Sequence, residues 1–203
     1  MRPLTATIDT AALAHNLGVA RSRAGAARVL AVVKADAYGH GLARVLPALA
    51  EADGLGLVEL DAAVRLREAG WKKRIVLLNG LFAADELAVA ARHDLAFAVH
   101  DAAQIAWLDA APAGARFDVL LKLNSGMNRL GFAPTAAVAA LEQIRAHRAV
   151  RTLTLMTHFA TADDARGVDW QLVAFDTVAT GTSLPRTLAN SAALLRHPQT
   201  HAD

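Results

Sequence analysis

The residues with the most informative chemistry in this sequence are Lys34 and Tyr38, which follow directly after an apolar run. Residues 31–42 read AVVKADAYGHGL, and residues 29–33 have the length and apolar character of a buried strand. An amine at the carboxyl end of a buried strand is partly removed from water, which disfavours its charged form and makes it a better nucleophile. The spacing therefore predicts a reactive lysine beside a phenol and a glycine-rich turn.

Further apolar runs along the chain have the length of strands, and helical patterns separate them. Residues 42–49 carry an apolar pattern of helical period, while Asp61, Asp101 and Pro134 are placed to begin later helices. This alternation predicts successive β-α units and therefore a parallel sheet. The expected strands are residues 29–33, 54–60, 74–79, 95–100, 117–124, 152–158 and 186–190.

Polar residues lie at the carboxyl ends of these runs, and in a barrel of parallel strands such ends meet on one face, where active sites form. An open doubly wound sheet is the competing architecture, but the G-x-G-x-x-G loop that usually follows its first strand is absent. We therefore predict an α/β fold, a (β/α)8 TIM-type barrel that is incomplete, with about seven β-α units. The polar strand-end residues are Lys34, Asn79, His100, Asn124, Ser125, His158, Asn190 and Ser191.

The composition narrows the class of protein. With 203 residues, 54% of them hydrophobic, the chain is long enough for a substantial core. No apolar run approaches the roughly 20 residues of a membrane-spanning helix, and the N-terminus lacks the apolar stretch of a secretory signal, so we expect a cytoplasmic protein without a membrane partner. A net charge of +2 gives no indication of a nucleic-acid partner. The sequence has no cysteine, which excludes disulfides and thiolate metal sites. We also predict no metal at histidines, because the i, i+4 pair His197 and His201 lies in a stretch with the pattern of a loop.

Four strings in this order along the chain resemble motifs of the alanine racemases, which are pyridoxal-phosphate enzymes with a (β/α)8 barrel and a smaller β-rich C-terminal domain. The second string departs from the family pattern, because Asn124 and Ser125 stand where the family has an acidic residue and a threonine. The strings are AVVKADAYGHGL at residues 31–42, KLNSGMNRLGF at 122–132, THFATAD at 157–163 and NSAA at 190–193.

The resemblance implies roles for the residues of the first and last strings. Lys34 would form the aldimine with pyridoxal 5'-phosphate and act as one catalytic base. Tyr38 would reach the cofactor phosphate through its hydroxyl, and Asn190 with Ser191 would belong to the phosphate-binding loop, where hydroxyl and backbone donors face an anion.

The two middle strings carry the remaining roles that the resemblance implies. Arg129 would hydrogen-bond the phenolic oxygen of the cofactor and lie near the substrate carboxylate, a task that suits the fixed donors of a guanidinium. Lys122 corresponds to a lysine that is often carbamylated and that positions this arginine. His158 would sit against the cofactor ring.

The match extends to Asp203, whereas family members continue for well over a hundred residues. The resemblance implies that the strand and helix of residues 1–28 associate with the second domain, that residues 29–203 form the incomplete barrel, and that the C-terminal β domain is absent. The family takes a second proton-transfer group, a tyrosine, from the partner subunit of a homodimer, and Tyr38 is the single tyrosine here. We expect these residues alone to show little racemase activity and poor cofactor retention.

Two functions follow as hypotheses. The first is an alanine racemase that interconverts L- and D-alanine and supplies D-alanine for peptidoglycan or serves alanine catabolism, with a broader amino-acid racemase left open. The second is a non-catalytic pyridoxal-phosphate-binding barrel, or a truncated and inactive racemase remnant. Cofactor binding without turnover would favour the second hypothesis.

Overall fold

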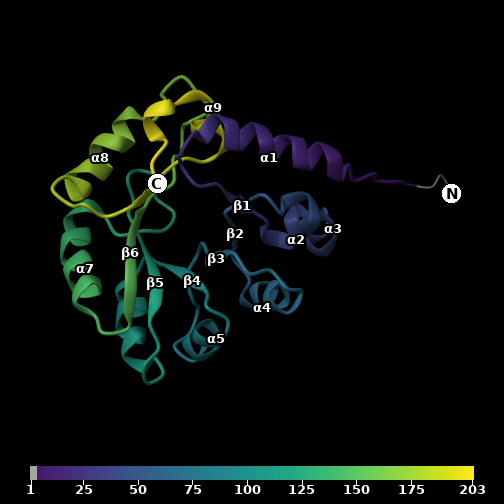
Figure 1. The fold of residues 1–203 in the computed structure, drawn as a ribbon. Coiled ribbons are helices and arrows are strands. Elements are labelled where there is room, and N and C mark those ends of the chain that lie inside the picture. Colours follow the sequence, from purple (N-terminus) through teal and green to yellow (C-terminus); the bar gives the residue numbers. More distant parts are fainter. Residues whose placement is uncertain (1–3) are drawn as a thin grey trace.

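The computed structural model describes residues 4–203, and its central feature is one parallel sheet of seven strands. The strands pair in the order of the chain, from β1 at one edge to β7 at the other. Figure 1 shows the sheet curling into an incomplete barrel with helices around its outer side. The predicted fold class is confirmed. The strands are β1 (Leu30–Val32), β2 (Gly54–Leu57), β3 (Arg74–Leu77), β4 (Ala96–Val99), β5 (Phe117–Lys122), β6 (Val150–Met156) and β7 (Arg186–Thr187).

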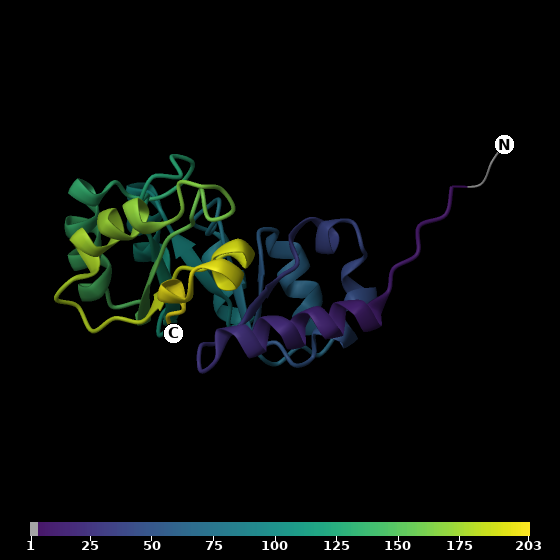
Figure 2. The same ribbon diagram turned by 90° about the horizontal axis from the view of Figure 1, so that it is seen from above.

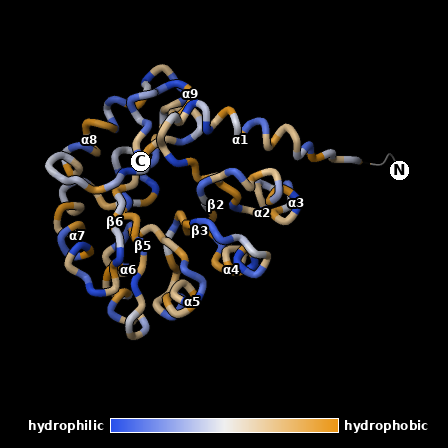
Figure 3. Tube along the Cα trace, in the orientation of Figure 1, coloured by the Kyte–Doolittle hydropathy of each residue, from blue (hydrophilic) through white to orange (hydrophobic). Residues whose placement is uncertain are grey.

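Helices connect the strands and cover the outer face of the sheet. Asp101 begins one of them as predicted, because its side chain accepts a hydrogen bond from the N–H of Ala103. Hydrophobic and hydrophilic stretches alternate along the outer helices, as expected when one side of a helix is buried (Figure 3). The helices are α1 (Thr10–Ala24), α2 (Lys34–Tyr38), α3 (Leu42–Val45), η1 (Leu46–Leu49), α4 (Leu60–Glu68), α5 (Glu86–Arg92), α6 (Ala102–Trp107), η2 (Leu108–Ala110), α7 (Pro134–Ala146), α8 (Asp169–Ala179), α9 (Ser191–Arg196) and η3 (Pro198–Thr200).

The apolar core has two layers, one between the helices and the sheet and a smaller one inside the barrel. Because residues two apart on a strand share a face, Lys122 lies on the same interior face as Leu120, at the carboxyl end of β5. Gly54 leaves room for the side chain of Leu30 on the neighbouring β1, since a Cβ there would lie 2.6 Å from Leu30 Cδ2. The interior layer consists of Leu30, Val76, Leu78, Ala96, Ala98, Leu120 and Met156.

The two edge strands approach each other near Asp203. The N–H of Arg28, just before β1, donates to the carbonyl of Asp203 (3.2 Å), and the N–H of Asp203 donates to the carbonyl of Arg186 on β7 (3.2 Å). The N–H of Arg186 also donates to the Asp203 carboxylate (2.9 Å). Asp203 therefore bridges the amino-terminal ends of the two edges of the sheet.

Residues 4–9, which precede α1, form no strand in this structure. The resemblance implies a strand at residues 5–9 that pairs with the sheet of the second domain, so this strand stays a prediction. The helix from Thr10 forms, with Asp9 as its N-cap. It contacts η1 and α9, and Figure 2 shows it beside the C-terminal segment. Of the helices in residues 4–203, none is long and apolar enough to cross a membrane.

Candidate active site

The turn after β1 is left-handed. Residues 35–38 all have φ between 52° and 55°, although none of them is glycine. Such a conformation costs roughly 1–2 kcal/mol per residue, so neighbouring groups must hold it in place. The carboxylate of Glu59, after β2, accepts the N–H of Ala35 (3.1 Å), and the carboxylate of Asp36 accepts the N–H of Leu42 at the start of α3 (2.7 Å).

This turn brings Lys34 and Tyr38 to the same side of the backbone. The Lys34 Nζ atom lies 5.8 Å from the centre of the Tyr38 ring. The tyrosine is 59% exposed, so its hydroxyl is open to a ligand. The predicted proximity of amine and phenol is present, but nothing in the residue types except Gly39 and Gly41, at the end of the turn, indicates a left-handed backbone.

The loop after β5 carries Arg129 and is organised by Asn124. The Asn124 side-chain oxygen accepts the N–H groups of Gly126 (3.1 Å) and Asn128 (2.9 Å), and its amide nitrogen donates to the Asn128 side chain (3.0 Å). The loop then folds back on β5, where a Cβ at Gly131 would lie 2.6 Å from the Asn124 backbone nitrogen. Asn124, which departs from the family pattern, therefore has a structural task in this loop.

Four basic groups lie near one another at the carboxyl ends of β1, β5 and β6. Burial, and then the positive charges of Arg129 and Lys34, lower the pKa of Lys122 from 10.5 to about 8. Burial also lowers the pKa of His158, with further contributions from Arg129, Lys122 and Lys34, so this imidazole is neutral at pH 7. These mutual repulsions show that the cluster favours an anionic ligand.

The residues after β6 and β7 form the opposite side of the site. The Asn190 side chain accepts a hydrogen bond from the N–H of Ala193 (2.9 Å) and donates one to the carbonyl of Phe159 (3.2 Å). Its oxygen and its nitrogen are therefore both bound to backbone groups of the protein. Ser191 is exposed at the start of α9. Among the described residues, no hydrogen bond from its hydroxyl is present, which leaves that group available to a ligand.

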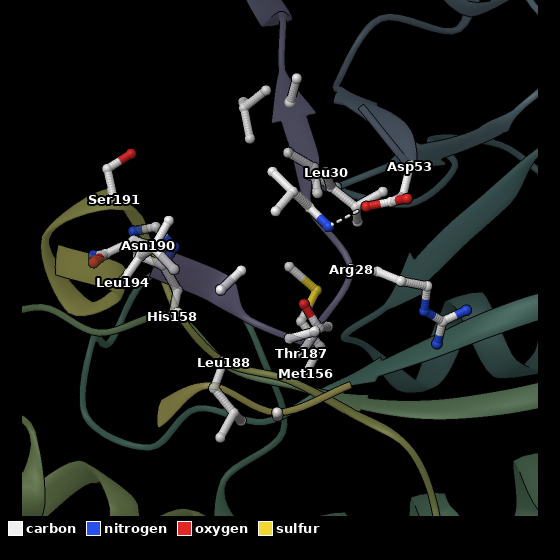
Figure 4. Close-up of a pocket in the computed structure, with 18 of the residues that line it drawn as sticks. Arg28, Leu30, Asp53, Met156, His158, Thr187, Leu188, Asn190, Ser191 and Leu194 are labelled. Atoms are coloured by element: carbon white, nitrogen blue, oxygen red, sulfur yellow. Dashed lines mark hydrogen bonds between the residues drawn. The ribbon is translucent and has the colours of Figure 1, made fainter. Parts of the chain in front are cut away.

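All the predicted site residues line one cavity of about 740 Å³. Figure 4 shows His158, Asn190 and Ser191 on one side of it, and Arg28 with Asp53 on the other. The acidic lining residues, Asp53 and Asp203, accept backbone N–H groups near the amino-terminal ends of strands, away from the basic cluster. The predicted residues that line the cavity are Lys34, Tyr38, Lys122, Arg129, His158, Asn190 and Ser191.

The donor set of this cavity fits a phosphorylated aromatic aldehyde such as pyridoxal phosphate. A primary amine is available for the aldehyde, the basic cluster would face the negative charges, and the exposed hydroxyl-bearing residues Tyr38 and Ser191 line the wall. Across residues 4–203, no group of three or more His, Asp or Glu side chains is placed to hold a metal ion.

Two supporting residues were missed by sequence reasoning. Glu59 holds the left-handed turn, and Gln171 lies fully buried beneath the loops after β5 and β6. An indication for Gln171 was present, because it lies one turn before the buried Phe175 on α8, where an apolar residue is expected. His40 and His100, in contrast, bind backbone carbonyls and do not line the cavity.

Comparison with known proteins places this arrangement in context. Residues 8–203 match the family model "Alanine racemase, N-terminal domain". The chain is 55% identical to an alanine racemase of Nitrosospira multiformis and 51% identical to one of Paraburkholderia phytofirmans, and in both cases it is covered completely while covering 57% of the relative. The chain thus spans little more than half the length of these relatives.

Solved structures give the same result. The biosynthetic alanine racemase of Pseudomonas aeruginosa superposes with a TM-score of 0.94 at 41% identity, over 100% of this chain and 57% of that one. A histidine racemase from Leuconostoc mesenteroides superposes with a TM-score of 0.83 at 27% identity, over 94% of this chain and 54% of that one. The barrel is therefore shared by racemases with different substrates.

Proposed function

The chain belongs to the alanine racemase N-terminal domain family, and we propose that it forms the cofactor-binding barrel of an alanine racemase that interconverts L- and D-alanine. The observation that carries this proposal is the convergence of Lys34, Lys122, Arg129 and His158 at one end of a single cavity. We further propose that the enzyme works in the cytoplasm and supplies D-alanine for peptidoglycan or serves alanine catabolism.

The residues around the cavity would hold pyridoxal phosphate at several points. Lys34 would bind the aldehyde through its amine, while the exposed hydroxyls of Tyr38 and Ser191 would donate hydrogen bonds to the phosphate. When bound, this cofactor withdraws electrons from the α-carbon of an amino acid and makes the α-proton acidic. Asn190 would contribute by fixing the loop that presents Ser191, since its own amide is already engaged.

Arg129 and His158 would set the charge distribution of the site. The Arg129 guanidinium has fixed, planar donors and would bind the phenolic oxygen of the cofactor and the carboxylate of alanine. The imidazole of His158 has a lowered pKa and is neutral at pH 7, so it would contribute hydrogen bonding without another positive charge. A strong cation bound to the substrate carboxylate would fix the orientation of the α-carbon.

The Lys34 amine would move a proton on one face of the α-carbon, and racemisation needs a second group on the other face. Tyr38 is the single tyrosine of the chain, and it lies where it would bind phosphate. We therefore propose that the second group comes from outside these 203 residues, from the partner subunit of a homodimer, and that this polypeptide alone racemises alanine slowly or not at all.

Lys122 would carry a carbamate in the active enzyme. Carbamylation requires a neutral amine, and the lowered pKa of about 8 provides a substantial neutral fraction near physiological pH. A carbamate would place negative charge near Arg129 and Lys34, and so replace repulsion by attraction. The buried lysine would then orient the arginine.

The experiment that tests the proposed function is exchange of the α-proton of alanine in deuterated water, followed by NMR with the protein and pyridoxal phosphate. A protein with one proton-transfer group should exchange the α-proton of one enantiomer without interconverting the two. Lys34→Ala should reduce this exchange to the rate with free cofactor. Cofactor binding without Lys34-dependent exchange would support the non-catalytic barrel, and absence of cofactor binding would support the truncated and inactive remnant.

A further inference from the structure

A fully buried glutamine connects the two loops that carry Arg129 and His158. Gln171, in the first turn of α8, is 0% exposed. Its side-chain oxygen accepts the N–H of Ala160 (2.7 Å), and its side-chain nitrogen donates to the carbonyl of His158 (3.3 Å) and to the Ser125 hydroxyl (3.2 Å). The orientation of the amide is fixed, because a backbone N–H requires an acceptor and a carbonyl requires a donor.

The hydroxyl groups beyond Gln171 form a chain with one possible direction. Thr157 donates its hydroxyl proton to the carbonyl of Leu123 (3.0 Å). Since a hydroxyl has a single proton, the 2.6 Å contact between Thr157 and Ser125 must be donated by Ser125, which in turn accepts from Gln171. Ser125 and Thr157 are each only 3% exposed, so this chain is shielded from water.

The backbone of residues 158–160 is held on two sides. Gln171 binds the carbonyl of His158 and the N–H of Ala160, and the carbonyl between them, that of Phe159, accepts from Asn190 after β7. The network therefore joins the carboxyl ends of β5, β6 and β7. Buried polar networks of this kind fix geometry, because displacing one member leaves several groups unpaired in a medium of low dielectric constant.

We propose that Gln171 is a positioning residue, which acts through Ser125 and the 158–160 backbone to set the distance between the Arg129 loop and the His158 imidazole. The Arg129 loop starts at Gly126 and ends at Gly131, and Arg129 itself is exposed, so the loop needs an anchor beneath it. The network is a property of the cofactor-free protein, and only its consequence for cofactor affinity rests on the proposed function.

The chain offers a matched control for this inference. Gln104 on α6 is also buried, and its side chain binds the carbonyl of Leu81 (2.9 Å) and the N–H of His100 (2.8 Å). It thus joins the ends of β3 and β4 in the way that Gln171 joins β5 and β6. Gln104→Leu and Gln171→Leu should lower the melting temperature by similar amounts, whereas only Gln171→Leu should affect the basic cluster.

The test compares Gln171→Leu, Ser125→Ala and Gln104→Leu in the 203-residue protein. The first readout is the pKa of His158, measured by NMR titration without cofactor. If Arg129 moves away from His158, one repulsion is lost and the His158 pKa rises toward 6.5. The second is the dissociation constant for pyridoxal phosphate. We expect Gln171→Leu and Ser125→Ala to raise the His158 pKa and to weaken cofactor binding, by about tenfold for Gln171→Leu, with neither effect for Gln104→Leu.

Ser125→Ala decides the outcome if Gln171→Leu does not fold, because it is the smaller change. It removes the hydrogen bonds of Ser125 with Gln171 and Thr157 and leaves one side-chain N–H of Gln171 without its acceptor, but the contacts of Gln171 with the 158–160 backbone stay in place. Unchanged His158 titration and unchanged affinity in the variants that fold would overturn the inference, as would equal effects of Gln104→Leu. A shifted His158 pKa together with no binding of pyridoxal phosphate by the unmodified protein would support the positioning role and contradict the proposed function instead.

Discussion

The Lys34 amine lies over the ring of Tyr38, with 5.8 Å between Nζ and the ring centre, because the backbone that joins them turns to the left. Residues four apart in a helical turn share a side, and the left-handed sense directs both side chains into the cavity. The Lys34 amine and the Tyr38 phenol, which we propose bind the cofactor, are thus placed by one strained turn, which the carboxylates of Glu59 and Asp36 hold in place.

The strain in this turn predicts an unusual response to glycine. Ala35 has φ 52°, so Ala35→Gly should leave the free energy of unfolding unchanged or raise it by up to about 1 kcal/mol, because glycine adopts this conformation without steric cost. The same change at the exposed Ala139, within the right-handed helix α7, should lower it by about 1 kcal/mol. Urea denaturation of both variants makes the comparison, and equal losses would show that the turn is not strained.

Tyr38 should contribute to binding of the phosphate and little to stability. Tyr38→Phe removes one hydroxyl from a side chain that is 59% exposed, so the melting temperature should stay within a degree or two of that of the parent protein. Loss of a hydrogen bond to a charged phosphate should weaken pyridoxal phosphate binding about tenfold. Pyridoxal, which has no phosphate, should bind both proteins equally, and a parallel loss of affinity for it would assign the hydroxyl another role.

Lys122 should make stability depend on pH in alkaline solution. Its pKa is about 8 in the folded protein and 10.5 when exposed, so between these values the unfolded chain binds more protons. The free energy of unfolding should therefore rise as pH increases from about 8 to 10.5, and the cost of the buried charge is fully present below pH 8. Lys122→Met should remove this rise and stabilise the protein below pH 8 by about 1 to 2 kcal/mol, since water in the cavity screens part of the cost.

Denaturation must be measured in buffer free of carbon dioxide, because a carbamate would cancel the effect. Bicarbonate labelled with ¹³C provides the complementary measurement. The parent protein should show one carbamate resonance that is absent from Lys122→Met and present in Lys72→Ala. Identical pH profiles of the parent and Lys122→Met would mean that the amine is not desolvated as the structure places it.

The sequence was sufficient to predict the strand order and the strand-end residues, because apolar period and helix caps are local properties. Asp101, for example, caps α6 as its position predicts. Strand length was less predictable: β7 contains only Arg186 and Thr187 of the expected residues 186–190, since Asn190 leaves the sheet to cap α9. The strand expected at residues 5–9 stays a prediction, because its expected partner is the sheet of the second domain.

The geometry of the site was harder to predict than the identity of the residues that line it. Alanine and tyrosine do not favour positive φ, so the sequence around Ala37 gives no indication of a left-handed turn, which tertiary contacts impose. The positioning role that we propose for Gln171 also depends on a contact with Ser125, which lies 46 positions away in the chain. Local patterns identify which residues reach the carboxyl ends of the strands, whereas the hydrogen bonds that orient them arise from the fold.

The most direct test of the central claim is to locate the lysine that binds the cofactor. The chain has four lysines, Lys34, Lys72, Lys73 and Lys122, so peptide mapping after borohydride reduction with one equivalent of pyridoxal phosphate distinguishes them clearly. We predict that the reduced cofactor is found on Lys34, that Lys34→Ala abolishes the label and that Lys72→Ala leaves it unchanged. Label distributed over the surface lysines, or retained in Lys34→Ala, would contradict the assignment of this cavity as a pyridoxal-phosphate site.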